Sequence, residues 1–328
     1  MTPREKAIAA FELRTSEGLV PHVELEFQLS QELVGRKALR SDDLKEATPA
    51  ERDRLLHENV EHWLAICERL DYCILTGLHW LGVEDQIESF KIVRERVGGR
   101  YMLSAFVDGT AGIPNGTDMM EQAWRMADRP DEVLAEHDRW ARDAAEVGKR
   151  LIGAGAEVVF MCADYCFNDG PWLSPPMFRR FVTPFLARNI AEFRKAGAWP
   201  VKHTDGDIMP ILDQLVECEP AAIHSLDPMA GVDIREVKRL YGHRVALMGN
   251  VNCALVQAGT KEQIAASARY CLELGGVAAG GYVFTTSNCI FAGVPLDNYF
   301  AMLDVRRQFG MQSEQPRGAT AGMRGAPV

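Results

Sequence analysis

The sequence predicts an α/β protein with the architecture of a (β/α)8 TIM barrel, formed as a single domain over residues 1–310. Short apolar runs alternate along the chain with helical patterns of about ten or more residues, and this alternation indicates βα units and a parallel sheet. Eight such runs can be counted, which is the number that a barrel needs. The alternative is a doubly wound open sheet, but no G-x-G-x-x-G pattern follows the first strand to support it.

The predicted strands share a short apolar run that is bounded by glycine or polar residues. They are 20–25, 72–76, 101–107, 157–163, 199–203, 221–226, 245–249 and 281–286. The predicted helices share apolar residues at helical spacing, and turn residues such as Gly98 end them. They are 3–13, 48–70, 83–97, about 117–126, 130–152, 176–196, 208–217, 233–241, 260–274 and 295–309. Residues 311–328 are rich in Gly, Pro and Ala without periodicity, so we expect a disordered tail there.

Composition and charge exclude several classes of partner. The net charge of −10 argues against nucleic acid, because phosphate contacts need clustered Lys and Arg. The charged N-terminal stretch has no apolar signal-peptide core, and no apolar run is long enough for a membrane span. The eight cysteines are scattered, without the dense spacing of secreted proteins. We therefore expect a cytoplasmic protein that binds neither nucleic acid nor membrane, with a homodimer as one option for its assembly.

Side chains that can bind metals or move protons follow nearly every predicted strand. In a barrel, the residues just past the carboxyl end of each strand line the active site. These residues are Glu24 and Glu26, His79, Asp108, Asp164, His203 and Asp205, Asp227, Asn250 and Cys253, and Asn288 and Cys289. Because surface loops are polar in any protein, the signal is the concentration of His, Asp and Cys at one pole.

The residue types at this pole predict a zinc site. His203 and Asp205 are two residues apart, so they point to the same side of a strand. Asp227, Cys253 and Cys289 end the next three strands. Zinc takes thiolate, imidazole and carboxylate ligands in a tetrahedral shell. The competing interpretation is that both cysteines are buried structural thiols and that His203 is a hydrogen-bonded core histidine.

The carboxylates at the same pole also suggest acid–base chemistry. Asp164 follows the fourth predicted strand and Asp108 follows the third. Paired carboxylates in a cleft can exchange protons or orient a substrate. The competing interpretation is that such residues cap helices or turns, as Asp227 would do before Pro228.

Four blocks follow one another over most of residues 156–310: "LSPPMFRRFVTPFLARNIAEFRKAGAWPVKHTDGD", "SLDP", "MGNVNCALVQAGTKEQIAASARYCLELGGVAAGGYVF" and "PLDNYFAML". In order and spacing, this part of the chain resembles the uroporphyrinogen decarboxylase superfamily. The fold of that superfamily is a (β/α)8 barrel, in agreement with the strand count. Its members include decarboxylases and corrinoid-linked methyltransferases.

Two departures make the chain more similar to the methyltransferase branch. The decarboxylases carry an Arg-rich "RQAGRY" loop that grips the porphyrinogen carboxylates, whereas this chain has "LEFQLSQELVGR" there. Their "GHG" after the last strand is matched here by "SNC", residues 287–289. The resemblance therefore implies transfer of a methyl group from a small methylated compound, such as a methoxylated one, to a Co(I) corrinoid (cobalamin). A separate partner, a corrinoid protein, would carry that cofactor.

The resemblance also implies a ligand set. The methyltransferase branch often has H-x-C after the fifth strand, where this chain has His203-Thr204-Asp205. Aryl-ether demethylase methyltransferases use a spaced Asp…Cys…Cys set, which Asp227, Cys253 and Cys289 match in order. These three residues are therefore implied as zinc ligands with His203 as the fourth, and the choice between His203 and Asp205 stays open.

The remaining polar residues receive roles in this hypothesis. Asp164 and Asp205 are the candidate acids, and Glu26, Asp108 and Asn250 are candidates for holding the substrate. Two rival functions stay open. One is a metal-free decarboxylase in which Asp164 or Asp205 is the essential acid. The other is a non-catalytic barrel that binds a corrinoid protein or a tetrapyrrole.

Overall fold

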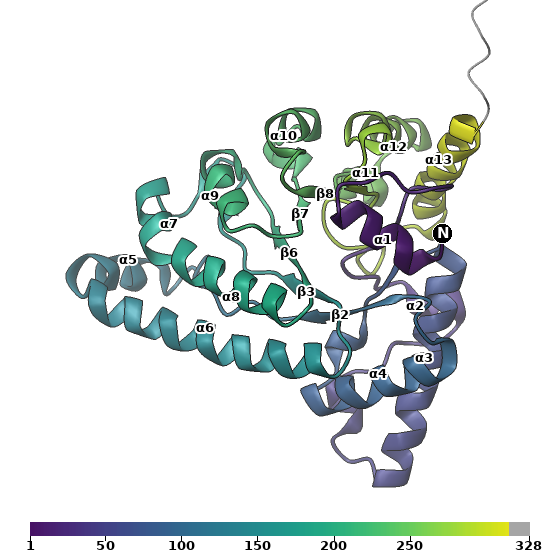
Figure 1. The fold of residues 1–328 in the computed structure, drawn as a ribbon, viewed down its shortest axis with the longest axis horizontal. Helices are drawn as coiled ribbons and strands as arrows, with labels where there is room; N and C mark the ends of the chain where they lie inside the picture. Colours follow the sequence, from purple (N-terminus) through teal and green to yellow (C-terminus); the bar gives the residue numbers. More distant parts are fainter. Residues whose placement is uncertain (315–328) are drawn as a thin grey trace, which may run out of the picture.

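Seven parallel strands form a curled sheet in the computed structural model, which describes residues 1–314 (Figure 1). Their spatial order is β1-β2-β3-β6-β7-β8-β9, and each strand pairs in parallel with the next. The strands are β1 (Ile74–Leu75), β2 (Met102–Phe106), β3 (Val158–Met161), β6 (Trp199–Thr204), β7 (Ala222–Ser225), β8 (Ala246–Gly249) and β9 (Tyr282–Val283). A small antiparallel hairpin, β4 (Cys166–Phe167) with β5 (Gly170–Pro171), follows β3. Six of the seven sheet strands fall within a predicted one, and β6 extends one residue past its predicted end at 203.

The first predicted strand, 20–25, is not a regular strand, but it occupies the eighth position of the barrel. Its backbone is hydrogen-bonded to both edges of the sheet, next to β9 and next to β1. The amide of Phe284 donates to Pro21 O at 2.9 Å, and the amide of Cys73 donates to His22 O at 2.8 Å. Pro21 has no N–H to give to a ladder, which explains why only an isolated bridge forms between His22 and Phe284. The segment therefore joins β9 to β1, and the prediction of a (β/α)8 barrel is confirmed.

Helices lie around the outside of the sheet (Figure 1). They are α1 (Pro3–Phe11), α2 (Ser30–Val34), α3 (Pro49–Leu70), α4 (Val83–Val97), α5 (Met119–Asp128), α6 (Pro130–Gly153), α7 (Pro175–Phe181), α8 (Thr183–Lys195), α9 (Leu212–Glu217), α10 (Ile234–Tyr241), α11 (Cys253–Ala258), α12 (Lys261–Leu274) and α13 (Leu296–Glu314). The helix predicted at 176–196 is divided at Val182, because Pro184 cannot donate to the preceding turn. Helix α13 continues past residue 310, and the rest of the predicted tail, 315–328, lies outside the described residues.

The pattern of burial explains why these segments take these conformations. The four residues of β3 are all buried, as are those of β7 and β8, which is typical of strands covered on both faces by helices and barrel core. Helix α3 begins at a capping box in which Thr48 and Glu51 satisfy each other's free amides. Among residues 1–314, no helix is both long and apolar enough to cross a membrane.

Candidate metal and acid–base site

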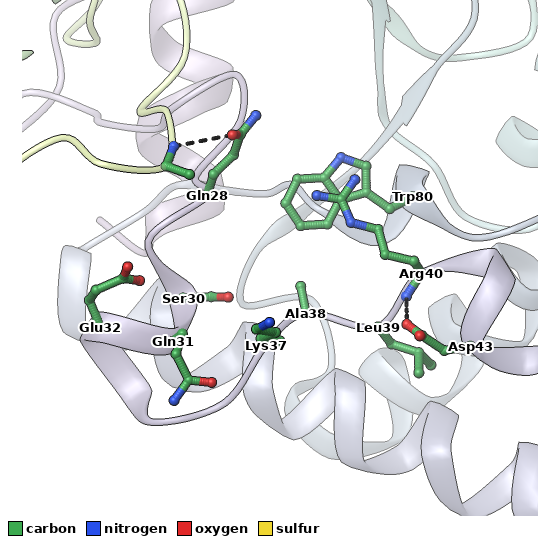
Figure 2. A pocket seen from close by; sticks show the side chains of 11 residues that line it. Gln28, Ser30, Gln31, Glu32, Lys37, Ala38, Leu39, Arg40, Asp43 and Trp80 are labelled. Atoms are coloured by element: carbon green, nitrogen blue, oxygen red, sulfur yellow. Dashed lines mark hydrogen bonds between the residues drawn. The ribbon is translucent and has the colours of Figure 1, made fainter.

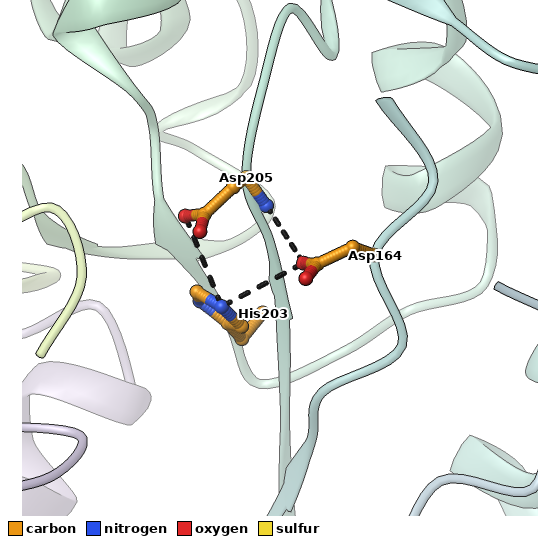
Figure 3. A group of neighbouring side chains, drawn as sticks. All are labelled: Asp164, His203 and Asp205. Carbon is orange, nitrogen blue, oxygen red and sulfur yellow. Dashed lines mark hydrogen bonds and ion pairs between the residues drawn. The ribbon is translucent and has the colours of Figure 1, made fainter. Parts of the chain in front are cut away.

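Asp164, His203 and Asp205 meet at the carboxyl end of two neighbouring strands (Figure 3). Strands β3 and β6 pair with Met161 opposite Lys202, so the residues that follow leave the sheet at the same edge. His203 Nε2 lies 3.8 Å from Asp164 Oδ1 and 3.8 Å from Asp205 Oδ1. The backbone amide of Asp205 donates to Asp164 Oδ1 at 3.0 Å, which holds the Asp164 carboxylate against the backbone that follows β6. We call these three residues the Asp–His–Asp group.

Burial gives the members of this group unusual protonation properties. His203 is 4% exposed. Burial and, to a smaller extent, the charge of Lys202 lower the pKa of its imidazole to about 3. Its imidazole is therefore neutral at physiological pH. Burial raises the pKa of Asp205 to about 7, and the nearby carboxylates of Asp164 and Asp227 add to the rise. Acidic groups are thus crowded against a neutral nitrogen, an arrangement that a bound cation would stabilise.

The spacing of the three ligand atoms fits a metal ion. Two of the separations are 3.8 Å, and all three atoms lie within 4.8 Å of one another. A point equidistant from such atoms is roughly 2.2–2.5 Å from each, close to zinc–nitrogen and zinc–oxygen bond lengths of about 2.0–2.2 Å. One imidazole and two carboxylates also suit Mn²⁺ or Fe²⁺, so the donor set fits a divalent cation without selecting zinc alone.

Hydrogen bonds on both sides of Asp164 and around Asp205 hold the group in place. The amide of Tyr165 donates to Thr204 Oγ1 at 2.9 Å, which fixes the residue after Asp164. Ser225 Oγ donates to Asp205 Oδ1 at 2.7 Å, and Asn288 Nδ2 donates to Asp205 Oδ2. The carboxylate of Asp205 is therefore oriented from the ends of β7 and β9.

Asp108, which the sequence predicts to hold substrate, pairs with a fully buried lysine. Lys202 Nζ donates to Asp108 Oδ2 at 2.7 Å and to Ala163 O at 2.9 Å, while the amide of Ala163 donates to Asp108 Oδ2 at 2.8 Å. The Ala163 peptide is thus held from both sides, immediately before Asp164. Burial alone would raise the pKa of Asp108, but the charge of Lys202 and the hydrogen bonds from Lys202, Thr110 and the Ala163 amide together outweigh burial, and the pKa is lowered.

The other predicted metal ligands lie outside the Asp–His–Asp group. Within the described residues, no other three His, Cys, Asp or Glu side chains bring ligand atoms within 4.8 Å of one another. Asp227 accepts from the amides of Gly206 at 3.3 Å and Met229 at 2.9 Å. Cys253 is the first residue of α11, and Cys289 is buried. Burial is the main cause that raises the pKa of both thiols, and the charge of Asp205 adds to it, so both are in electrostatic reach of the group.

The other two predicted substrate-binding residues, Asn250 and Glu26, are each held by hydrogen bonds within the protein. Asn250 Nδ2 donates to Leu226 O at 2.6 Å, and Asn250 Oδ1 accepts from the thiol of Cys271 at 3.3 Å. Its side-chain amide therefore joins the segment after β7 to helix α12. Glu26 Oε1 lies 3.2 Å from His79 Nε2, and this hydrogen bond is the largest of the influences that lower the pKa of Glu26.

Figure 2 shows a groove of about 480 Å³ that is lined by Gln28 and Trp80. Gln28, which lines the groove, donates to Glu26 Oε2 at 3.1 Å, and Trp80 follows His79 in the chain. The guanidinium of Arg40 lies 3.5 Å from the centre of the Trp80 ring. The lining is Gln28, Ser30, Gln31, Glu32, Lys37, Ala38, Leu39, Arg40, Asp43, Trp80 and Ala292.

The sequence reasoning missed Lys202, His224 and Ser225. His224 stands directly opposite His203 in the pairing of β7 with β6, and the two Nδ1 atoms are 2.8 Å apart. A signal was present, because "VKHT" and "AIHS" place a histidine one residue before the end of each strand. A lysine inside a barrel strand is also unusual enough to indicate a buried partner.

Comparisons with known proteins agree with this fold. Residues 81–309 match the model of the family described as uroporphyrinogen decarboxylase (URO-D). The uroporphyrinogen decarboxylase of Coxiella burnetii (strain Dugway 5J108-111) is 27% identical over 172 residues, which cover 50% of this chain and 44% of that protein. The chain thus spans about half the length of the curated relatives that it matches.

Solved structures resemble the whole barrel. A methyltransferase from Methanosarcina mazei has a TM-score of 0.70 at 19% identity, covering 94% of this chain and 99% of that one. A B12-independent methionine synthase from Shewanella sp. W3-18-1, in complex with selenomethionine, has a TM-score of 0.53 at 13% identity, covering 90% and 94%. At these identities, the likeness is one of fold.

Proposed function

Because this chain belongs to the uroporphyrinogen decarboxylase family, we propose that it is a metal-dependent methyltransferase of that family's corrinoid-linked kind. It would take a methyl group from a small methylated compound, and a Co(I) corrinoid on a partner protein would accept it. The observation that carries the proposal is the Asp–His–Asp group, whose spacing fits a divalent cation such as zinc. The fold that the chain shares with a protein named as a methyltransferase adds support.

In this proposal, the chain's own residues hold the cation and manage the proton. His203 offers a neutral nitrogen, and Asp205 and Asp164 offer carboxylate oxygens. When bound, the cation supplies Lewis acidity to the oxygen from which the methyl group departs. The side chain of Asp164 is 48% exposed, so it is the member best placed to pass a proton between that oxygen and solvent. Glu26, held by His79, lies on the same pole and contacts the substrate.

The partner needs a surface on which to dock, and the carboxyl pole is the candidate. Several large apolar side chains are exposed in segments that follow the strands. They are Phe167, Met209, Met229 and Phe291. An aromatic and methionine-rich rim of this kind suits a protein partner.

The test is metal analysis of the purified protein, followed by methyl transfer to free Co(I) cobalamin across a panel of small methylated compounds. His203→Ala and Asp205→Asn are expected to lose both the cation and activity. Cys253→Ser and Cys289→Ser decide whether the thiols are ligands, as the sequence predicts. The proposal is wrong if the purified wild type contains no divalent cation and the His203→Ala and Asp205→Asn variants keep the activity of the wild type.

A decarboxylase is the second candidate, because the curated relatives are named uroporphyrinogen decarboxylases. Asp164 or Asp205 would then be the essential acid, and the reaction would need no cation. Release of carbon dioxide from uroporphyrinogen by the metal-free protein would establish it. Tight corrinoid binding without turnover of either kind would instead favour a carrier.

A further inference from the structure

His203 and His224 form a buried pair, and one hydrogen bond joins a ring nitrogen of each. They face each other across β6 and β7, and neither side chain is appreciably exposed. Their Nδ1 atoms are 2.8 Å apart, a hydrogen-bond distance, so one Nδ1 must carry a proton and the other must accept it. Burial lowers the pKa of both rings, so each has one N–H and one lone pair.

Two arrangements of these protons exist, and they differ at His203 Nε2. If His203 Nδ1 donates, its Nε2 carries a lone pair toward Asp164 and Asp205. If His224 Nδ1 donates, His203 Nε2 carries a hydrogen instead. That hydrogen would find no acceptor within hydrogen-bond reach in the group, because both carboxylate oxygens are 3.8 Å away.

The direction in which His203 Nε2 points favours the first arrangement. Nε2 is the ring nitrogen that faces Asp164 and Asp205, at 3.8 Å from an oxygen of each. A cation held between those carboxylates needs a lone pair on Nε2, which places the ring proton of His203 on Nδ1. His224 Nδ1, 2.8 Å away, must then accept that N–H.

We propose that His224 is a positioning residue, which accepts the Nδ1–H of His203 and so holds the His203 Nε2 lone pair toward the cation. This inference rests on the cation site of the proposed function. Metal-bound histidines almost always donate their second N–H to a carboxylate, a carbonyl or water. Here the neutral imidazole of His224 accepts the Nδ1–H of His203. A carboxylate in that position would add a further negative charge to a pole already crowded by Asp164, Asp205 and Asp227.

The proposal is tested by cation affinity, with Co²⁺ alone as the probe in calorimetry of the full-length protein. His224→Leu removes the acceptor and is expected to weaken Co²⁺ binding about 10- to 100-fold. His224→Asn places an amide oxygen near the position of Nδ1 and should recover most of that loss. His137→Leu is the matched control, because His137 is a buried histidine whose Nδ1 contacts Phe181 O instead, and it should bind Co²⁺ as the wild type does.

A second readout does not depend on variants. In the Zn²⁺-loaded protein, ¹⁵N–¹H correlation spectra should show His203 protonated at Nδ1 only. The inference is overturned if His203 is protonated at Nε2, or if His224→Leu binds Co²⁺ as tightly as the wild type. If the wild type binds no cation, both this inference and the proposed function fail. If it binds Co²⁺ with the expected pattern but transfers no methyl group, only the proposed reaction fails.

Discussion

The buried ion pair of Lys202 and Asp108 gives a prediction whose size follows from the structure. Lys202 is fully buried, the Asp108 side chain is 13% exposed, and their atoms are 2.7 Å apart. Removing one partner leaves the other charge buried and unpaired, which costs about 3–5 kcal/mol. We expect Lys202→Met to lower the free energy of unfolding by that amount, and Asp108→Asn to do the same. The double variant has no buried charge. Its loss of unfolding free energy should therefore be smaller than the sum of the two single losses, by about 2 kcal/mol or more.

Urea unfolding of the four proteins at neutral pH measures this coupling. Lys91→Met is the control, because Lys91 pairs with Glu88 on the surface and its loss should barely move the unfolding midpoint. The Lys202–Asp108 pair also holds the peptide before Asp164, so both single variants should bind Co²⁺ more weakly than the Lys91 control. Strictly additive unfolding energies would refute the reasoning, since they would mean that the two charges do not stabilise each other.

Three further predictions concern the barrel itself. Burial raises the pKa of Glu24 to about 7, so the folded state keeps a proton that the unfolded state releases above its own pKa near 4.5. Glu24 should therefore lower stability by about 3 kcal/mol as the pH rises from 4.5 to 7, and Glu24→Gln should remove that contribution from the pH dependence of urea unfolding, leaving the part that comes from Asp205; an unchanged pH slope would contradict it. Gly77→Ala places a Cβ against the Trp63 ring at a φ of +95°, and should destabilise by about 1–3 kcal/mol with altered tryptophan fluorescence. Thr48→Ala removes the cap that accepts from Glu51 N and should cost about 1 kcal/mol in the same unfolding assay, whereas no change would mean that solvent replaces the cap.

Sequence patterns were sufficient for the sheet because burial on both faces leaves a clear signal. The run at 245–249 is apolar throughout, the run at 157–163 is apolar after Glu157, and both contain strands. The pattern did not predict the structure fully in two segments. At 20–25 Pro21 removes a ladder donor and no regular strand forms, and at 176–196 Pro184 divides the predicted helix in two. Both exceptions have the same cause, which is a missing backbone N–H in an otherwise regular segment.

The site was harder to predict because loop conformation decides which of several carboxylates converge. The two-residue spacing correctly placed His203 and Asp205 on one side, where both reach the same group. Asp164 joins them because Ala163 and Tyr165 are held by other strands. Asp227 accepts from the amide of Met229 in its own loop and from the amide of Gly206 after β6, and its role as a ligand stays a prediction. No spacing rule distinguishes these outcomes.

The position of the group within the barrel separates the two candidate ligand sets. The Asp–His–Asp group comes from β3 and β6, which are adjacent, so its geometry depends on one strand pairing. The predicted set of His203, Asp227, Cys253 and Cys289 instead extends around the ends of β6, β7, β8 and β9. Oxygen ligands favour harder cations and thiolates favour zinc, so the two sets differ in selectivity as well as place. If the Cys253→Ser and Cys289→Ser variants keep the cation and the Asp164→Asn variant loses it, the cation is bound at the ends of β3 and β6. It is then not bound by the predicted set around the ends of β6, β7, β8 and β9.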